Sequence, residues 1–301
     1  MQAVLDELPF AFSLLVSGVS IGLMYSLIAL GFVLVYKATD AINFAQGEFV
    51  MLAGFMATTA LTLKGMPILA AIAFAVAGMI VLSFALERTV LRPLLGRPVV
   101  AVIMATIGLA AILRGLPPIT IGAQTKTIPL PIPDTPIALG PASIAPIQLL
   151  GVVVALACLG AFTWFFMKSR MGVAMRAVAD NQQVAMAMGI NVERYFAIAW
   201  AMAGIVSALG GIIWGSMLGV DTQLALVGLK VFPVVILGGL DSIVGAVVGG
   251  LIVGVVESLA AGYLDPFVGG GTKDFAPYVL MIIMLMFKPY GMFGKRKIER
   301  I

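Results

Sequence analysis

The sequence contains no histidine and only one cysteine, Cys158, among its 301 residues. Without histidine, Ser-His-Asp triads, Cys-His nucleophiles and the usual zinc sites are excluded, and a lone cysteine excludes an internal disulfide. Charge is also scarce, because charged residues make up 11% of the chain, against about 25% in soluble domains. These absences argue against a soluble domain and against most integral-membrane hydrolases.

Hydrophobic residues make up 61% of the chain and gather in long runs separated by short polar breaks. A hydrocarbon core about 30 Å thick needs about 20 apolar residues per helix, and continuous runs exclude the alternating strands of a barrel. The prediction is an all-α, polytopic bundle of eight to nine membrane segments in a single transmembrane domain. The segments are expected at about 10–36, 43–63, 67–87, 99–116, 146–167, 196–218, 224–239, 243–262 and 275–290.

Two of these segments, 99–116 and 224–239, are short and contain or adjoin Pro and Gly. Either is therefore a candidate half-helix that lines a cavity. The region between 117 and 146 holds seven prolines from Pro117 to Pro141. It is predicted to be an outer loop with extended pieces, which either docks an external partner or simply connects two spans.

The distribution of basic residues orients the chain. Thirteen of the eighteen Lys and Arg lie at one set of loop ends, and the positive-inside rule makes these ends cytoplasmic. The N-terminus is therefore predicted outside and the C-terminus in the cytoplasm, and the net charge of +4 needs no nucleic-acid partner to explain it. The thirteen are Lys37, Arg88, Arg92, Arg97, Lys168, Arg170, Arg176, Arg194, Lys288, Lys295, Arg296, Lys297 and Arg300; the other five are Lys64, Arg114, Lys126, Lys230 and Lys273.

Polar residues inside the predicted spans are few. Asn43, Gln46 and Glu48 cluster at the start of the second span, and Glu257 lies some fourteen residues into its own. Groups of this kind are costly in lipid, which favours a role in a transport pathway or gate. The alternatives are that Glu48, only about 7 Å of helix rise beyond Asn43, reaches interfacial water, and that Glu257 has a structural hydrogen-bond partner.

Small residues recur every fourth position from Ala203 to Gly219, and GxxxG occurs twice between Gly245 and Gly254. Such stripes let helix backbones approach closely where lipid supplies no hydrophobic driving force. Packing within one subunit is favoured over a subunit interface.

The region 168–195 is predicted to be a cytoplasmic loop that contains a short, separately capped helix from Asp180 to Gly189. Asp180 or Asn181 can cap this helix, and Gly189 can end it in the left-handed conformation. A small apolar face that includes Val184, Ala185 and Met188 has no core of its own to cover. The segment is therefore read as a docking element rather than as a solvated surface helix.

Four ordered motifs carry a family resemblance that covers nearly the whole chain apart from the Pro-rich loop. They are IGLMYSLIALGFVLVYKATDAINFAQGEFVMLAGF, then VLRPLLGRP with ATIGLAAILRG, then GVAMRAVADNQQVAMAMGINVERYFAIAWAMAGIVSALGG, and finally FKPYGMFGKR. The chain resembles the shorter permease subunit of bacterial branched-chain amino acid ABC importers of the Liv type.

The resemblance implies a multi-pass inner-membrane channel subunit that is not an enzyme. Its expected partners are a second, related permease in a heterodimer, two cytoplasmic ATP-binding cassette subunits, a periplasmic solute-binding protein and membrane lipid. This chain is expected to bind no cofactor, with ATP and Mg held by the ATPase subunits. The coupling residues are then Arg176, Asp180, Asn181, Ala185, Met188 and Gly189, and the pathway residues Asn43, Gln46, Glu48, Thr106 and Glu257.

Other functions remain open at the level of sequence. Urea, short amides or another small carboxylate are alternative cargoes, because related permeases carry them and the external binding protein sets much of the selectivity. A secondary transporter would need coupling-ion ligands in its spans, and only Glu48 and Glu257 are available. A membrane enzyme is disfavoured by the missing histidine and the lack of clustered carboxylates.

Overall fold

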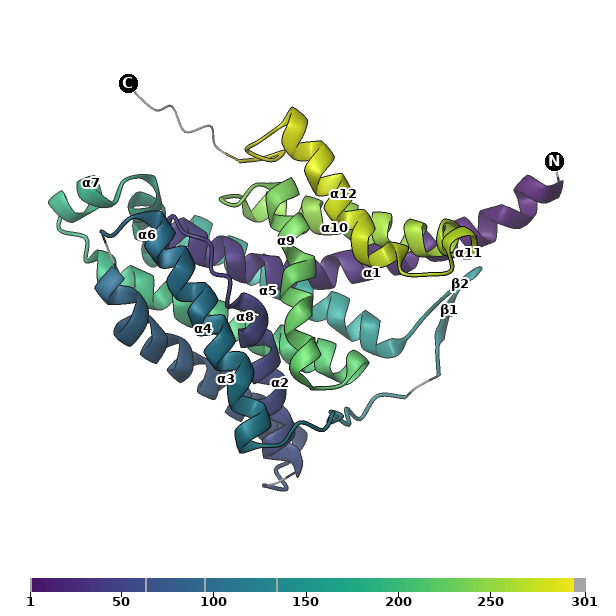
Figure 1. Ribbon diagram of the computed structural model, residues 1–301, viewed down its shortest axis with the longest axis horizontal. Coiled ribbons are helices and arrows are strands. Elements are labelled where there is room, and N and C mark those ends of the chain that lie inside the picture. Colours follow the sequence, from purple (N-terminus) through teal and green to yellow (C-terminus); the bar gives the residue numbers. More distant parts are fainter. Residues whose placement is uncertain (1, 63, 95, 134, 295–301) are drawn as a thin grey trace. The chain divides into compact units, whose positions relative to one another are not determined.

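The computed structural model describes residues 2–62, 64–94, 96–133 and 135–294, and these residues are mostly helical (Figure 1). A hairpin of two short strands and three short turns of π- or 3₁₀-helix complete the described secondary structure. The helices are α1 (Gln2–Thr39), α2 (Gln46–Thr62), α3 (Ile68–Leu86), α4 (Val99–Thr120), α5 (Pro146–Lys168), α6 (Arg170–Asp180), α7 (Gln182–Ala187), α8 (Val192–Leu218), α9 (Leu226–Gly238), α10 (Ile243–Tyr263), α11 (Asp265–Val268) and α12 (Thr272–Phe287). The other elements are η1 (Glu87–Leu91), η2 (Arg92–Leu94), η3 (Thr222–Ala225), β1 (Ile137–Leu139) and β2 (Ala142–Ile144).

Each predicted membrane segment corresponds to a helix, which confirms an all-α, polytopic protein. Six helical stretches in the described chain are long and apolar enough to cross a membrane: Leu8–Thr39, Ile68–Leu94, Val99–Thr120, Pro146–Lys168, Val192–Leu218 and Ile243–Tyr263. The helices α2, α9 and α12 are shorter, with 17, 13 and 16 residues. The basic residues Lys295, Arg296, Lys297 and Arg300 lie outside the described residues.

The segment predicted at 99–116 is not a half-helix. The helix α4 has 22 residues and continues through Pro117 and Pro118 to Thr120, so the predicted start of the outer loop was wrong. Each proline removes one backbone donor from the last turn of α4, and the helix ends two residues after the second proline. Farther along the loop, β1 and β2 pair as an antiparallel hairpin. The sequence pattern predicts only a loop with extended pieces there.

The chain forms two compact units. The terminal unit comprises the residues up to Ala29, Pro131–Leu156 and the residues from Lys230 onward. The middle unit comprises Leu30–Leu130 and Ala157–Leu229. Three of the four boundaries fall within the helices α1, α5 and α9, so each of these helices contributes residues to both units; the fourth lies in the loop after α4.

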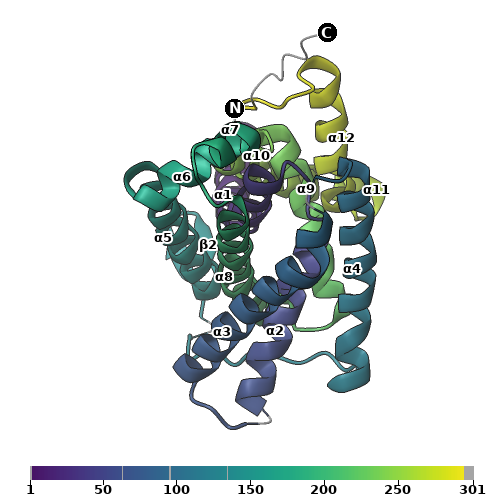
Figure 2. The same ribbon diagram turned by 90° about the vertical axis from the view of Figure 1, so that its left-hand side faces the viewer.

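Helices α2, α3 and α8 pack together as the core of the middle unit, and α2 and α3 lie side by side in Figure 2. The small-residue stripe of α8 meets neighbours in this unit: Gly211 lies against the backbone of Val50 in α2, and Gly215 lies against the Val220 side chain. Gly204, outside the stripe, lies against the backbone of Met79 in α3. Beside them the rings of Phe49 and Trp200 meet edge to face, with centroids 5.9 Å apart. The stripe therefore packs within the chain, as predicted.

Helix α10 packs in the terminal unit through two glycine pairs on different faces. Gly250 and Gly254 lie against Gly18 and Gly22 of α1, and Gly245 and Gly249 lie against the end of α9. A Cβ atom added at Gly250 would lie 2.5 Å from the Gly22 carbonyl oxygen, so the two backbones are in direct contact. Both GxxxG motifs thus serve packing within one subunit, also as predicted.

We expect Gly250→Ala to destabilise the protein and Gly108→Ala to leave it unchanged or slightly more stable. The added methyl at Gly250 meets backbone, whereas no atom lies within 4 Å of a Cβ at Gly108 in α4. Overpacking costs about 1–3 kcal/mol, whereas alanine in an open helix gains about 0.5–1 kcal/mol over glycine. Thermal unfolding of the detergent-solubilised variants measures the difference, and equal unfolding temperatures would contradict the close α1–α10 packing.

Candidate substrate pathway and coupling segment

The chain bends sharply between α1 and α2, over residues 40–45. Asp40 has a φ of 56°, in the left-handed region that Asp tolerates better than most residues. The Asn43 side chain then accepts a hydrogen bond from the Ala45 backbone N–H, at 3.0 Å. Asn43, the first residue of the predicted polar cluster, therefore stabilises the bend through a local hydrogen bond.

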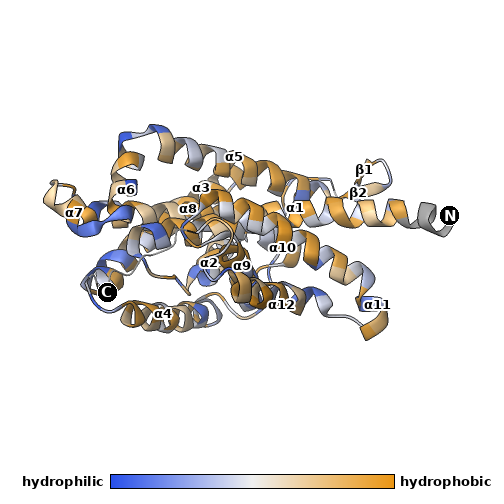
Figure 3. Ribbon diagram, turned by 90° about the horizontal axis from the view of Figure 1, so that it is seen from above, coloured by the Kyte–Doolittle hydropathy of each residue, from blue (hydrophilic) through white to orange (hydrophobic). Residues whose placement is uncertain are grey.

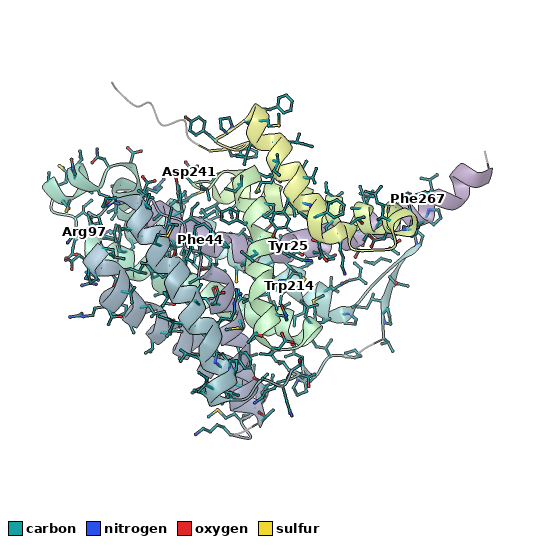
Figure 4. All side chains as sticks on the ribbon, viewed as in Figure 1. Tyr25, Phe44, Arg97, Trp214, Asp241 and Phe267 are labelled. Carbon is teal, nitrogen blue, oxygen red and sulfur yellow. The ribbon has the colours of Figure 1, made fainter. Side chains whose placement is uncertain are left out.

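Thr106 of α4 binds this bend from outside it. Its hydroxyl accepts a hydrogen bond from the Phe44 backbone N–H at 3.3 Å and donates one to the Ile103 carbonyl at 2.9 Å. Thr106 is about 10 Å of helix rise from the start of α4. Figure 4 labels Phe44 within the middle unit. Thr106 thereby ties α4 to the bend.

Gln46 connects the bend to α8. Its side-chain amide is fully buried and donates a hydrogen bond to the Ser207 hydroxyl at 2.9 Å. Ser207 in turn donates to the Ala203 carbonyl at 2.8 Å, and Asn43 donates to the Gln46 amide oxygen at 3.4 Å. Sequence reasoning treated Ser207 only as a small residue of the stripe, because nothing in the sequence places its hydroxyl opposite an amide 161 positions away.

Glu48 forms an ion pair with Arg114 of α4. The guanidinium Nε lies 3.2 Å from Glu48 Oε1, and Nη2 donates to the same oxygen. The Glu48 side chain is only 3% exposed, whereas that of Arg114 is 45% exposed. Arg114 was assigned only to the outer group of basic residues; its position within an apolar run was the available signal, since a charge inside a span needs a partner.

Glu257 has different partners, all in the terminal unit. Its Oε1 lies 3.3 Å from Lys230 Nζ, which also contacts Asp274 at 2.6 Å. The buried Tyr25 hydroxyl interacts with the same carboxylate. Four of the five predicted pathway residues, Asn43, Gln46, Glu48 and Thr106, thus come together in the middle unit. Glu257 of α10 is linked through Lys230 of α9 to Asp274 of α12. This agrees with the alternative that Glu257 has a structural hydrogen-bond partner.

The predicted cytoplasmic loop contains the expected capped helix, α7. Asn181 caps it by accepting a hydrogen bond from the Val184 backbone N–H at 3.0 Å. After Met188, Gly189 has a φ of 81° and closes the segment, so both predicted end signals are confirmed. The loop also contains α6, which was not predicted; Ser169 caps that helix through the Gly172 backbone N–H at 2.8 Å.

The helix α7 and the residue that follows it, Met188, present apolar side chains to their surroundings. Val184 and Met186 are exposed, and the Met188 side chain is 78% exposed. Ala185 is instead buried, and Gln182 donates a hydrogen bond to the Ala38 carbonyl at the end of α1. Arg176, Asp180 and Asn181 are exposed. In Figure 3 hydrophilic residues gather around α6 and α7, whereas α4 and α10 are largely hydrophobic. Ala185 therefore anchors the segment, and its neighbours remain available to a partner.

Long apolar helices, a polar bend held inside them and an exposed apolar segment define a membrane protein of the permease class. Over residues 14–287 the chain matches the family described as the permease component of the branched-chain amino acid transport system. The chain belongs to this family, whose members are transport subunits and not enzymes.

Individual relatives agree with this assignment over almost their full length. The chain is 33% identical to the high-affinity branched-chain amino acid transport permease BraD of Pseudomonas aeruginosa, over 95% of this chain and 97% of BraD. It is 32% identical to LivH of Escherichia coli, over 95% and 96% of the two chains. It is 31% identical to the probable LivH of Methanocaldococcus jannaschii, over 91% and 90%.

A solved structure shows the same fold. PsaBC from Streptococcus pneumoniae, determined in complex with Fab, superposes with a TM-score of 0.51 over 97% of this chain and 98% of that one. The two are only 13% identical, so this likeness concerns the fold alone.

We expect Ser207→Ala to lower stability by about 1–3 kcal/mol, the cost of leaving the buried Gln46 amide without its partner. The matched control is Ser216→Ala on the same helix, whose hydroxyl bonds only the Ile212 carbonyl four residues earlier. Thermal unfolding of the purified variants compares the two. Equal effects would mean that the Gln46–Ser207 hydrogen bond does not hold the bend.

Proposed function

We propose that this chain is the translocation subunit of an ATP-driven importer that takes up branched-chain amino acids delivered by a periplasmic binding protein. The similarity to branched-chain amino acid permeases, which extends over at least nine-tenths of each chain compared above, carries the proposal. A pair of cytoplasmic ATPase subunits supplies the energy and holds ATP and Mg. A second, related permease completes a heterodimer in the bacterial inner membrane.

The proposed topology has nine membrane segments, with the N-terminus outside and the C-terminus in the cytoplasm. It is supported by the match of nine helices to nine predicted segments and by the basic loop ends. Helix α9, with 13 residues, spans about 20 Å at 1.5 Å per residue and so serves as the half-helix of this arrangement.

The proposed coupling segment is α7 with its flanking residues. Its exposed residues, Met188 above all, dock on an ATPase subunit, with Arg176, Asp180 and Asn181 at the rim. Because Ala185 and Gln182 fasten the segment to its own unit, a displacement of the ATPase moves the helices behind it. A helix docked on a moving partner supplies the differential contacts that switching between two states requires.

The proposed pathway runs past the bend between α1 and α2, where Asn43, Gln46, Glu48 and Thr106 supply polar groups. A cargo with a hydrophobic side chain and a zwitterionic head needs few charges, which agrees with a sparsely charged interior. Glu257 belongs to the pathway only through its effect on the packing of α9, α10 and α12.

Reconstitution tests the function. The permease pair and the ATPase subunits are placed in lipid vesicles and supplied with the binding protein. Labelled leucine, isoleucine or valine should accumulate only when ATP is present on the ATPase side. Excess unlabelled leucine should abolish the signal, whereas urea, acetamide and propionate should not compete. If one of those three compounds accumulates and the branched-chain amino acids do not, that compound is the transported substrate. Accumulation without the ATPase subunits would indicate a secondary transporter.

Gly189 provides a test of the coupling segment. Gly189→Val should reduce the uptake achieved per ATP hydrolysed about tenfold, because a β-branched residue strains the left-handed backbone that ends α7. Gly189→Asn should retain most of the coupling, since Asn tolerates that conformation. No atom lies within 4 Å of a Cβ at this position, so crowding cannot account for a difference. Identical uptake and hydrolysis in both variants would contradict the role given to α7.

A further inference from the structure

We propose that Arg114 binds the carboxylate of the transported amino acid, with Glu48 acting as the positioning residue that holds its guanidinium in place. The inference rests on the proposed function, because it assigns a substrate-binding residue within that transport pathway. The ion pair between the two residues joins α4 to the first turn of α2.

The guanidinium is occupied on one edge only. Nε and Nη2 both donate to Glu48 Oε1, whereas Nη1 makes no hydrogen bond to any described residue. An arginine carries five N–H donors in a rigid plane, and two of them on one edge match the two oxygens of a carboxylate. With 45% of the Arg114 side chain exposed, the Nη1 edge is open to a planar oxyanion.

The direction of the side chain argues against a simple lipid-facing arginine. Arg114 lies about 9 Å of helix rise before Thr120, the nearer end of α4. A basic side chain in lipid normally extends toward the nearer surface to reach water. Arg114 instead reaches Glu48, directly after the bend that Thr106 binds two turns earlier in α4. The guanidinium thus points away from the nearer end of α4, as the tilt of the Cα–Cβ bond toward the helix N-terminus favours.

The local sequence leaves room for a ligand. The residues three and four positions before Arg114 are Ala111 and Ala110, and the next residue is Gly115, where an added Cβ would meet no atom of another segment within 4 Å. Charged groups within membrane segments generally face the interior of a bundle or a water-filled cavity. A half-exposed guanidinium that contacts a buried carboxylate beside small residues is therefore suited to a polar solute passing along the helix.

The charge balance suits a zwitterion. The ion pair is neutral as a whole, and an amino acid with one carboxylate and one ammonium group is neutral as well. Its carboxylate can occupy the open guanidinium edge without leaving net charge in the membrane. Because Glu48 already shares the guanidinium, the carboxylate is held less tightly than by an unpaired arginine, and it can leave again.

The test uses the complete complex in lipid vesicles with four variants: Arg114→Gln, Arg114→Lys, Glu48→Gln and the double variant Glu48→Gln with Arg114→Gln. Arg114→Gln should lower ATP-driven leucine uptake about 10- to 100-fold, the change expected for losing a charge-assisted hydrogen bond. Arg114→Lys should retain part of the uptake. Lys64→Gln, at an exposed position after α2, should behave like the wild type.

The double variant separates a ligand role from a structural one. It carries no unpaired charge, so its unfolding temperature should return toward that of the wild type, while its uptake should stay as low as that of Arg114→Gln. Recovery of wild-type uptake would show that Arg114 only neutralises Glu48, and would overturn the proposal. Loss of the second permease from purified Arg114→Gln complexes would show that Arg114 lies at the interface with that subunit, and would also overturn the proposal.

A binding measurement identifies the group that Arg114 recognises. Leucine should raise the unfolding temperature of the detergent-solubilised wild-type complex without binding protein, and isopentylamine, which is leucine without its carboxylate, should not. Arg114→Gln should remove the leucine effect. Equal shifts from both compounds, or a transport defect that varies with the content of anionic lipid and so points to a lipid phosphate, would overturn the proposal. A wild-type complex that takes up no branched-chain amino acid would instead overturn the proposed function, and this inference with it.

Discussion

Every polar group buried among packed helices needs a partner supplied by the protein, and the bend between α1 and α2 depends on that requirement. A buried chain that leaves helical geometry must satisfy its freed backbone groups within the protein. Here Asn43 binds the Ala45 N–H and Thr106 binds the Phe44 N–H. The buried Gln46 amide then fastens the bend to Ser207 of α8. Without these partners, residues 40–45 would favour a continuous helix or an exit to water.

Close helix packing makes this arrangement possible. Small residues on α8 bring its backbone against those of α2 and α3, close enough for Ser207 to meet Gln46. In the terminal unit, the glycines of α10 do the same toward α1 and α9. Dispersion and short hydrogen bonds replace the hydrophobic effect as the source of affinity between helices in lipid. The stripes are thus the means by which polar side chains on distant segments reach one another.

The helix α7 follows a different physical rule, because hydrophilic residues surround it (Figure 3). Asn181 and Gly189 set the two ends of α7 by local hydrogen bonding and backbone geometry alone, and such signals are visible in sequence. The direction in which α7 faces is a tertiary property: Ala185 is buried, and Val184, Met186 and Met188 are exposed. The preceding helix α6 was missed because Ser169 and Gly172 give a weaker start signal within a run of basic residues.

The sequence by itself determined the all-α membrane class, the approximate helices, both ends of α7 and the internal use of the glycine stripes. Each of these follows from periodicity, length or local capping, which act over a few residues. Only the tertiary structure decided that Thr106 binds Phe44, that Glu48 pairs with Arg114, and that Glu257 pairs with Lys230. Those partners lie between 27 and 66 positions apart in the chain. Which buried polar groups meet depends on how the helices are packed, and apolar runs of similar composition allow many packings.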